Sequence, residues 1–200
     1  MGSYGAVLAN GAEFTGDFGS LTWDALVEFH RIRIEAVAAT KPDLLAFETV
    51  PCVFESSAIV KALEQCSSKG ITLQPAWISF SCRDSHSSNA GDSAEACATS
   101  IKDSPFVFGV GVNCTKPEFV KGILESYKKT LEGSGKVLIC YPNKGETWDA
   151  VGRGWVDQTG VQNVEAYADM AKSWIEAGAT IVGGCCRIGP NHLACLKESL

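Results

Sequence analysis

The sequence predicts an α/β fold of the (β/α)8 barrel type, incomplete, with about six strand-then-helix units present. Short apolar runs alternate along the chain with longer segments of helical periodicity, which is typical of parallel strands joined by right-handed crossovers. Polar or reactive residues follow successive predicted strands, and a barrel gathers such residues on one face. No linker or low-complexity tract interrupts the chain, so residues 1–200 are predicted to form a single domain.

The predicted strands are short runs of apolar residues, of which the first is weak. They cover residues 3–9, 44–48, 76–81, 107–114, 136–141 and 180–182. An open doubly wound sheet is the competing architecture, but its functional groups would converge mainly at one switch point. Here they follow each strand in turn, at Asn10, Glu48, Ser81, Cys114, Asn143 and Cys185. Since a closed barrel has eight strands and roughly 250 residues, this chain is expected to be two units short.

Capping residues and helix breakers place the intervening helices. Thr22 is expected to cap a helix that ends before Pro42, and Asp92 or Ser93 is expected to cap another. A helix over residues 54–66 lies between these two. The segment Thr115-Lys116-Pro117-Glu118 has the spacing of a capping box with proline near the first helical position. A short helix over residues 191–200 ends the chain.

Composition and charge exclude several classes of protein. The net charge is -6, and the 17 basic residues are scattered, which argues against a nucleic-acid partner. No apolar run approaches the roughly 20 residues that a membrane span needs, and no export signal precedes residue 10. Nine cysteines, an odd number with irregular spacing, are therefore interpreted as reduced thiols in a cytoplasmic protein.

The segment Gly183-Gly184-Cys185-Cys186 predicts a metal site. Adjacent cysteines can bind one ion only if the backbone bends sharply, which the glycines permit. With Cys114, they would supply three thiolates to a zinc ion whose fourth position stays open for a substrate sulfur. The residues alone leave three alternatives open: buried thiols, a vicinal disulfide, or a closed structural site with His192 as fourth ligand.

Other residues carry weaker signals. Glu48 at a strand end would suit a substrate ammonium group, but it could equally form a cap or a salt bridge. The Gly109-Val110-Gly111 segment lies inside a strand and indicates close packing rather than a dinucleotide site. His30, His86 and His192 are expected at the surface. Trp148 and Trp155, in the long loop 142–162, could line a pocket or pack the loop down.

Five motifs are spread in order over essentially all 200 residues: Gly2-Ser3-Tyr4-Gly5-Ala6, Phe47-Glu48-Thr49-Val50-Pro51, Gly111-Val112-Asn113-Cys114-Thr115, Tyr141-Pro142-Asn143 and Gly183-Gly184-Cys185-Cys186-Arg187. Together they resemble the motifs of the homocysteine S-methyltransferases, with the plant-type enzymes most similar.

The resemblance implies a (β/α)8 barrel in which Cys114, Cys185 and Cys186 bind Zn²⁺. The sulfur of homocysteine would take the fourth position and accept a methyl group from S-methylmethionine or S-adenosylmethionine, which gives methionine. Glu48 would hold the amino group of homocysteine, and Asn113 is a second candidate for substrate binding. Selenocysteine is the alternative acceptor. The partners would thus be small molecules, and neither the preferred donor nor the oligomeric state is indicated.

The chain departs from the family at its start. Family members carry an upstream segment with the first strands and an Asp-Gly-Gly motif, whereas Met1 falls where the third strand would begin. The chain is therefore expected to be an N-terminally truncated barrel. A non-catalytic zinc-binding or thiol redox protein is the alternative function that such a truncation would support.

Overall fold

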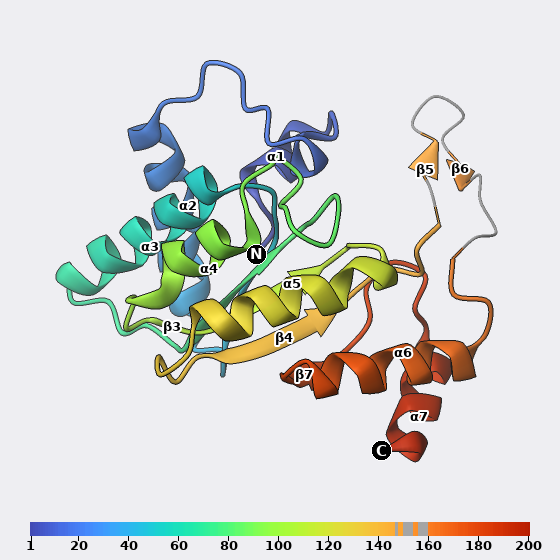
Figure 1. Ribbon diagram of the computed structural model, residues 1–200. Coiled ribbons are helices and arrows are strands. Elements are labelled where there is room, and N and C mark those ends of the chain that lie inside the picture. Colours follow the sequence, from blue (N-terminus) through green and yellow to red (C-terminus); the bar gives the residue numbers. More distant parts are fainter. Residues whose placement is uncertain (147, 150–153, 156–159) are drawn as a thin grey trace.

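A computed structural model describes residues 1–146, 148–149, 154–155 and 160–200. Its main feature is a five-stranded parallel sheet with the order β1-β2-β3-β4-β7. Each strand is followed by a helix, so the crossovers of the predicted units are present (Figure 1). The strands are β1 Leu45–Val50, β2 Ala76–Phe80, β3 Val107–Asn113, β4 Val137–Tyr141 and β7 Ala179–Val182.

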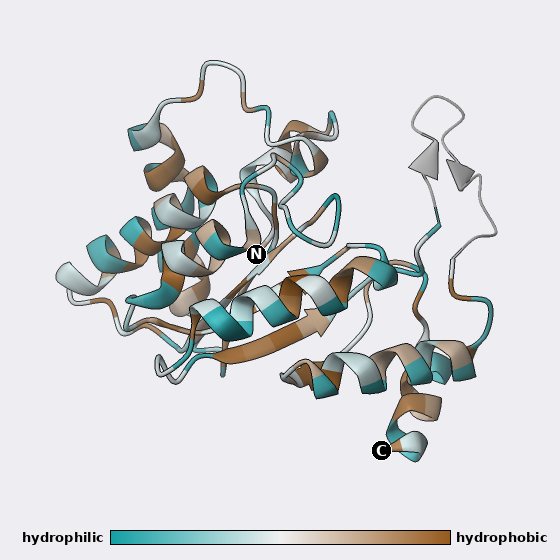
Figure 2. Cartoon of the chain, viewed as in Figure 1, coloured by the Kyte–Doolittle hydropathy of each residue, from teal (hydrophilic) through white to brown (hydrophobic). Residues whose placement is uncertain are grey.

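The helices pack against one face of this sheet. Alternate residues of each strand, such as Phe47, Ile78 and Val110, are buried against them in the hydrophobic core. Helix α5 shows the pattern clearly, because Val120 and Ile123 face the core while charged residues face solvent (Figure 2). The helices are α2 Trp23–Ala38, α3 Val53–Ser68, α4 Ala94–Lys102, α5 Pro117–Thr130, α6 Val164–Glu176 and α7 Pro190–Ser199.

The opposite face of the sheet, here called the inner face, carries the other residues of the strands. Among them are Trp77 and Ser79 on β2, and Tyr141 on β4. The two glycines of β3 lie between these strands, because Gly109 is paired with Trp77 and Gly111 with Ser79. A Cβ atom at Gly111 would lie 2.3 Å from the Ser79 Oγ atom, so the predicted close packing at this glycine pair is confirmed.

The expected strand over residues 3–9 is wrong. Residues Tyr4–Leu8 form a short helix, α1, which is followed by a 3-10 turn, η1, at Ala12–Phe14. Only the residues before α1 continue the sheet, because Gly2 forms a parallel bridge with Glu48. The Tyr4 N–H, which has no partner within the helix at its first position, donates to the buried carboxylate of Glu55. Asn10 consequently follows a helix, not a strand.

Two expected caps are confirmed and one is wrong. Thr22 caps α2 by accepting a hydrogen bond from the Ala25 N–H, and Ser93 caps α4 in the same way. Helix α5 begins at Pro117 as expected, but its N-cap is Lys116, which makes no side-chain cap. The Thr115 hydroxyl is used elsewhere, since it accepts from the Cys82 N–H and donates to the Asn113 carbonyl.

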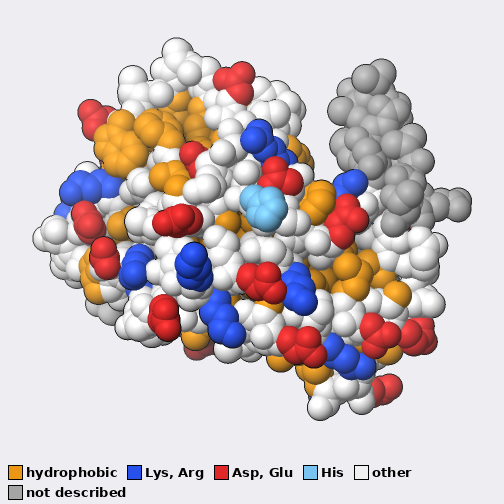
Figure 3. All heavy atoms as spheres, viewed as in Figure 1, with side chains coloured by type: hydrophobic (Ala, Val, Ile, Leu, Met, Phe, Trp, Pro, Cys, Tyr) orange, Lys and Arg blue, Asp and Glu red, His pale blue; other side chains and the backbone are white. Residues whose placement is uncertain are grey.

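The surface mixes charges of both signs. Lysine, arginine, aspartate and glutamate side chains are interspersed over the face that α5 occupies (Figure 3). In the part of the chain that the structure describes, no helix is long and apolar enough to span a membrane.

The long loop after β4 contains two short strands of two residues each, β5 Trp148–Asp149 and β6 Gly154–Trp155, which pair in antiparallel fashion. The side chains of Trp148 and Trp155 lie outside the described residues, so the two interpretations of these tryptophans stay untested.

Candidate metal centre

Three sulfur atoms meet where two strands end. Cys114 follows β3 directly, and Cys185 and Cys186 come shortly after β7. The Sγ atom of Cys186 lies 3.7 Å from that of Cys114 and 3.8 Å from that of Cys185. All three sulfurs lie within 4.8 Å of one another. The structure therefore brings together the three cysteines that the sequence analysis selected.

The spacing fits one tetrahedral ion. With metal–sulfur bonds of about 2.3 Å, as for zinc, the ligands of such an ion lie about 3.8 Å apart. The distance of 3.8 Å between the two adjacent cysteines also excludes the vicinal disulfide. His192 is not part of this group, because its Nδ1 atom accepts a hydrogen bond from the Gly189 N–H. The cluster thus offers three candidate protein ligands and a side open to solvent, on which Cys186 is exposed.

Backbone hydrogen bonds join the loops after β3, β4 and β7 into one corner. The Cys185 N–H donates to the Pro142 carbonyl over 2.8 Å, and the Lys144 N–H donates to the Cys186 carbonyl over 3.0 Å. The Asn143 N–H donates to the Thr115 carbonyl, which adds the loop that carries Cys114. The positions of the ligands are therefore set mainly by the loop after β4, which supplies no sulfur itself.

The double glycine makes the turn at the cysteines possible, and Gly184 matters most. A Cβ atom at Gly184 would lie 2.2 Å from Cγ2 of Ile188, whose N–H closes the turn onto the Cys185 carbonyl. At Gly183 a Cβ atom would meet only Tyr141, at 3.4 Å. The hydroxyl of the buried Tyr167 on α6 donates to the Gly183 carbonyl over 2.5 Å and holds this segment against the helix.

The three cysteines differ in the pKa of their thiols. Cys114 donates a hydrogen bond toward Cys185, which lowers the pKa of Cys185 to about 6 and raises that of Cys114. Burial raises the pKa of Cys186, with a further contribution from the charge on Cys185. The metal-free corner therefore holds a thiolate at neutral pH, which is the form in which cysteine binds metal ions.

Glu48 lies on the inner face of the sheet, within β1 rather than at its end. Burial raises the pKa of the Tyr141 hydroxyl, and the negative charge of the Glu48 carboxylate raises it further. Tyr141 is in turn fixed by two hydrogen bonds: the Trp77 Nε1–H donates to its oxygen over 3.1 Å, and its hydroxyl donates to Ser79 Oγ over 2.8 Å. The sequence analysis missed this hydrogen-bonded group of Tyr141, Trp77 and Ser79 on the inner face.

Asn113 bridges β1 and β3 next to the metal centre. Its Oδ1 atom accepts from the Thr49 N–H over 2.8 Å, and its Nδ2 donates to the Thr49 hydroxyl over 2.9 Å. Both Thr49 and the neighbouring Cys114 have left-handed backbones, with φ of 60° and 47°. The side chain of Asn113 is buried and retains one N–H and one oxygen lone pair beyond these bonds.

The histidines differ from expectation at one position. His30 is buried, not exposed, and its Nε2 atom lies 2.9 Å from the carboxylate of Glu55 between α2 and α3. An ion-pair group also lies beside the cysteine turn: the nearly buried carboxylate of Glu146 contacts the exposed Arg187 at 2.6 Å and the half-buried Lys144 at 3.3 Å. A lone acid in a long loop gave no signal for this role.

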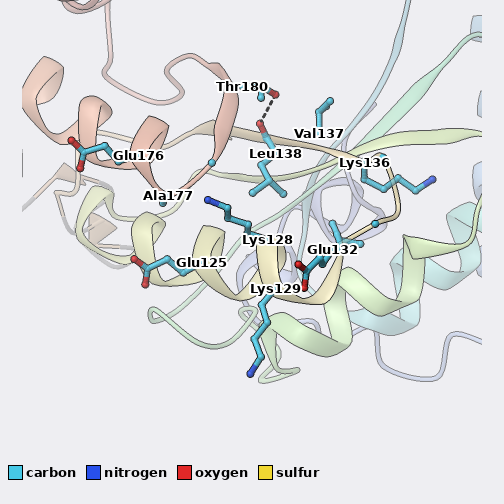
Figure 4. A pocket seen from close by; sticks show the side chains of 14 residues that line it. Glu125, Lys128, Lys129, Glu132, Lys136, Val137, Leu138, Glu176, Ala177 and Thr180 are labelled. Atoms are coloured by element: carbon cyan, nitrogen blue, oxygen red, sulfur yellow. Dashed lines mark hydrogen bonds between the residues drawn. The ribbon is translucent and has the colours of Figure 1, made fainter.

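A hollow of about 720 Å³ lies at the other end of the sheet (Figure 4). It is lined by the segment before β4 and by the C-terminal ends of α5 and α6, with Lys128 and Glu176 among the charged residues. Acidic and basic side chains are mixed there. Because the metal centre lies at the C-terminal ends of the strands, this hollow is separate from it.

Comparisons with known proteins agree with this geometry. The family model described as homocysteine S-methyltransferase matches residues 1–200. The chain belongs to this family. The family predicted from the sequence motifs is thereby confirmed.

Among curated relatives, homocysteine S-methyltransferase 3 of Zea mays is 39% identical over 201 residues, which cover 100% of this chain and 57% of the relative. A selenocysteine Se-methyltransferase of Brassica oleracea var. italica is 36% identical and is covered to 56%. The chain thus spans a little over half the length of the relatives it matches.

Among solved structures, the metallated form of the homocysteine methyltransferase MmuM from Escherichia coli superposes with a TM-score of 0.78 at 30% identity. This match covers 99% of the chain and 59% of MmuM. The oxidized form of the same enzyme gives a TM-score of 0.80 at 31% identity. With the five parallel strands, this likeness confirms the α/β fold of an incomplete barrel.

Proposed function

We propose that this chain binds zinc through Cys114, Cys185 and Cys186 and methylates the sulfur of homocysteine, which gives methionine. The observation that carries the proposal is the triangle of three sulfurs at 3.7 and 3.8 Å, open on one side. Membership in the homocysteine S-methyltransferase family supports the acceptor. The existence of a metallated form of MmuM supports a metal in this family.

Each of the chain's residues has a distinct task in this proposal. The three cysteines hold the ion, and Glu48 on the inner face binds the ammonium group of homocysteine. Asn113 offers its remaining N–H and lone pair to the same substrate. When bound, zinc would lower the pKa of the substrate thiol and keep its sulfur in the thiolate form.

The methyl donor is proposed to be a sulfonium, S-methylmethionine or S-adenosylmethionine. The thiolate sulfur attacks the methyl carbon, a new carbon–sulfur bond forms, and the bond to the sulfonium sulfur breaks. The leaving group departs as a neutral thioether that takes the electron pair, so the reaction needs no general acid. The chain has only to position the two sulfur atoms in line and to exclude water.

Selenocysteine is a second candidate acceptor, because a selenocysteine Se-methyltransferase matches the whole chain at 36% identity. A selenol is more acidic than a thiol and would occupy the same open position. Competition between the two acceptors in one assay distinguishes the two functions.

The test uses the 200-residue chain loaded with zinc. We expect one zinc per chain by atomic emission, and methionine by mass spectrometry after addition of homocysteine and S-methylmethionine. Cys114→Ser and Cys186→Ser should both lose the zinc. Cys195→Ser is the matched control, because this half-buried thiol on α7 lies outside the triangle.

Two results would contradict the proposal. Zinc retained by both ligand variants would refute the three-thiolate site. A folded, zinc-loaded chain that forms no methionine would refute the catalytic part and favour a non-catalytic zinc-binding or thiol redox protein.

A further inference from the structure

We propose that Glu146 is a positioning residue for the metal centre, which acts through its ion pair with Arg187. This pair holds the residue next to Cys186 and thereby keeps the Cys186 sulfur beside the other two. The inference rests on the proposed function, in which Cys186 is one of three zinc ligands. It concerns the geometry of the ligands and not the transfer of the methyl group.

The cysteine turn places an arginine where glycine is usual. The Ile188 N–H donates to the Cys185 carbonyl over 3.1 Å, so residues 185–188 form a β-turn with Cys186 and Arg187 at its centre. Arg187 is the third residue of this turn, and its φ of 66° lies in the left-handed region. Glycine or asparagine is preferred there, because a larger side chain crowds the backbone. The conformation of Arg187 therefore needs support from outside the turn.

Glu146 supplies this support through both of its carboxylate oxygens. The Arg187 Nη2 group donates to Oε1 over 3.2 Å, and Nε lies 2.6 Å from Oε2. A guanidinium group that contacts two oxygens is fixed in orientation as well as in position. The Lys144 ammonium group donates to Oε1 over 3.3 Å, so two cations compensate the nearly buried carboxylate.

Glu146 is itself held by the base of the loop after β4. The Oδ1 atom of Asn143 accepts from the Gly145 N–H over 2.8 Å, which makes an Asx turn, and Gly145 adopts a φ of 91° that suits glycine. The other end of the loop packs against the glutamate, because a Cβ atom at Gly160 would lie 3.0 Å from Cγ of Glu146. The carboxylate thus has supports that do not involve Arg187.

A second contact joins the same two segments one residue earlier. The Lys144 N–H donates to the Cys186 carbonyl over 3.0 Å. The loop therefore holds the cysteine turn at two successive residues, by a backbone bond at Cys186 and by the ion pair at Arg187. A single contact would leave the segment free to rotate about it. Cys186 is the most sensitive ligand, because it is exposed whereas Cys114 and Cys185 are half-buried.

The experiment replaces Arg187 by glycine in the zinc-loaded chain. This change relieves the left-handed residue but removes the ion pair, so its two effects oppose each other. We expect the loss of the ion pair to dominate and the zinc Kd, measured by competition with a chromophoric chelator, to rise about tenfold. Iodoacetamide should then modify Cys186 faster than Cys114 or Cys185 in peptide maps, because a released thiolate is the reactive form.

The same substitution in a second background isolates the role of Glu146. Glu146→Gln keeps the shape of the side chain and removes its charge, and it should raise the zinc Kd by a similar factor. Because the ion pair is then already absent, adding Arg187→Gly only relieves the strained backbone. In the Glu146→Gln background the further change in zinc Kd should be a decrease, or less than about twofold.

Controls come from elsewhere in the chain. Glu28→Gln breaks an ion pair of the same length, 2.6 Å to Arg31 on α2, and should leave the zinc Kd and the alkylation of Cys186 unchanged. The buried thiols Cys82 and Cys97 report on unfolding, since they become reactive only if the core opens.

The outcomes separate this inference from the proposed function. Equal effects of Arg187→Gly in the two backgrounds would overturn the inference, since the arginine would then act without Glu146. Tighter zinc binding by Arg187→Gly alone would overturn it too, as would labelling of Cys82 together with Cys186, which would show a general loss of structure. A chain that shows the expected zinc binding but forms no methionine would overturn only the catalytic part of the proposed function.

Discussion

Substitution of Gly184 by alanine should weaken zinc binding without unfolding the chain. The new Cβ atom would lie 2.2 Å from Cγ2 and 2.6 Å from Cβ of Ile188, both well short of the 3.4 Å at which ordinary van der Waals contact begins. Because Ile188 closes the turn that carries Cys185, relief of this clash must move the turn or the isoleucine. Overpacking of this kind costs about 1–3 kcal/mol. If the metal-bound turn carries that strain, the zinc Kd rises roughly 5- to 150-fold.

The matched control is Gly183→Ala, one residue away in the same motif. Its Cβ atom would meet only Tyr141, at 3.4 Å, so we expect the zinc Kd to change less than about threefold. Competition with a chromophoric chelator measures both constants, and urea unfolding of the metal-free proteins monitors the fold. The reasoning is refuted if the two alanine variants bind zinc equally well.

Three further predictions concern neighbouring residues. Asn113→Ala leaves the Thr49 N–H without its acceptor, so the free energy of unfolding in urea should fall by about 1–3 kcal/mol; unchanged stability would show that the bridge contributes nothing. In metal-free protein, alkylation of Cys185 by iodoacetamide should rise between about pH 5 and 7, because its pKa is about 6. Cys82, buried with a pKa of about 12, should remain unmodified in peptide maps, and equal labelling would contradict this. Tyr167→Phe, which removes the bond to the Gly183 carbonyl, should weaken zinc binding several-fold by chelator competition, and an unchanged Kd would argue against this support.

The strands that pair in the sheet were predictable because each is a continuous apolar run, buried by helices on one face. The structure of residues 3–9 was not predictable in this way, because Tyr4–Leu8 is a short apolar run that is equally compatible with a strand and with a short helix. A residue far away in the sequence distinguishes the two, because the Glu55 carboxylate accepts a hydrogen bond from the Tyr4 N–H at the start of the helix. The same holds for Thr115, whose local spacing fits a capping box but whose hydroxyl bonds to the Cys82 backbone. Tertiary contacts override local signals at both positions.

The cluster of three cysteines was predictable because two of them are adjacent in the chain and the third follows a buried strand. The hydrogen bonds of Tyr141 were not, because they depend on how β2 and β4 align across β3. No local pattern states that Trp77 and Ser79 will meet Tyr141. The closest signal was the pair Gly109 and Gly111, which indicated close packing inside a strand but not the side chains that use the space.

Asn113 connects the strand that carries Glu48 to the loop that carries Cys114. It is followed by the ligand Cys114, and its side chain holds Thr49, the residue after Glu48. Thr49 and Cys114 both adopt left-handed backbones, which are unfavourable for residues with a side chain and which persist only where neighbours enforce them. The two bonds of Asn113 stabilise the first of these, and the metal would hold the second through its sulfur. Asn113 thus fixes the residue that follows Glu48 relative to the loop that carries Cys114.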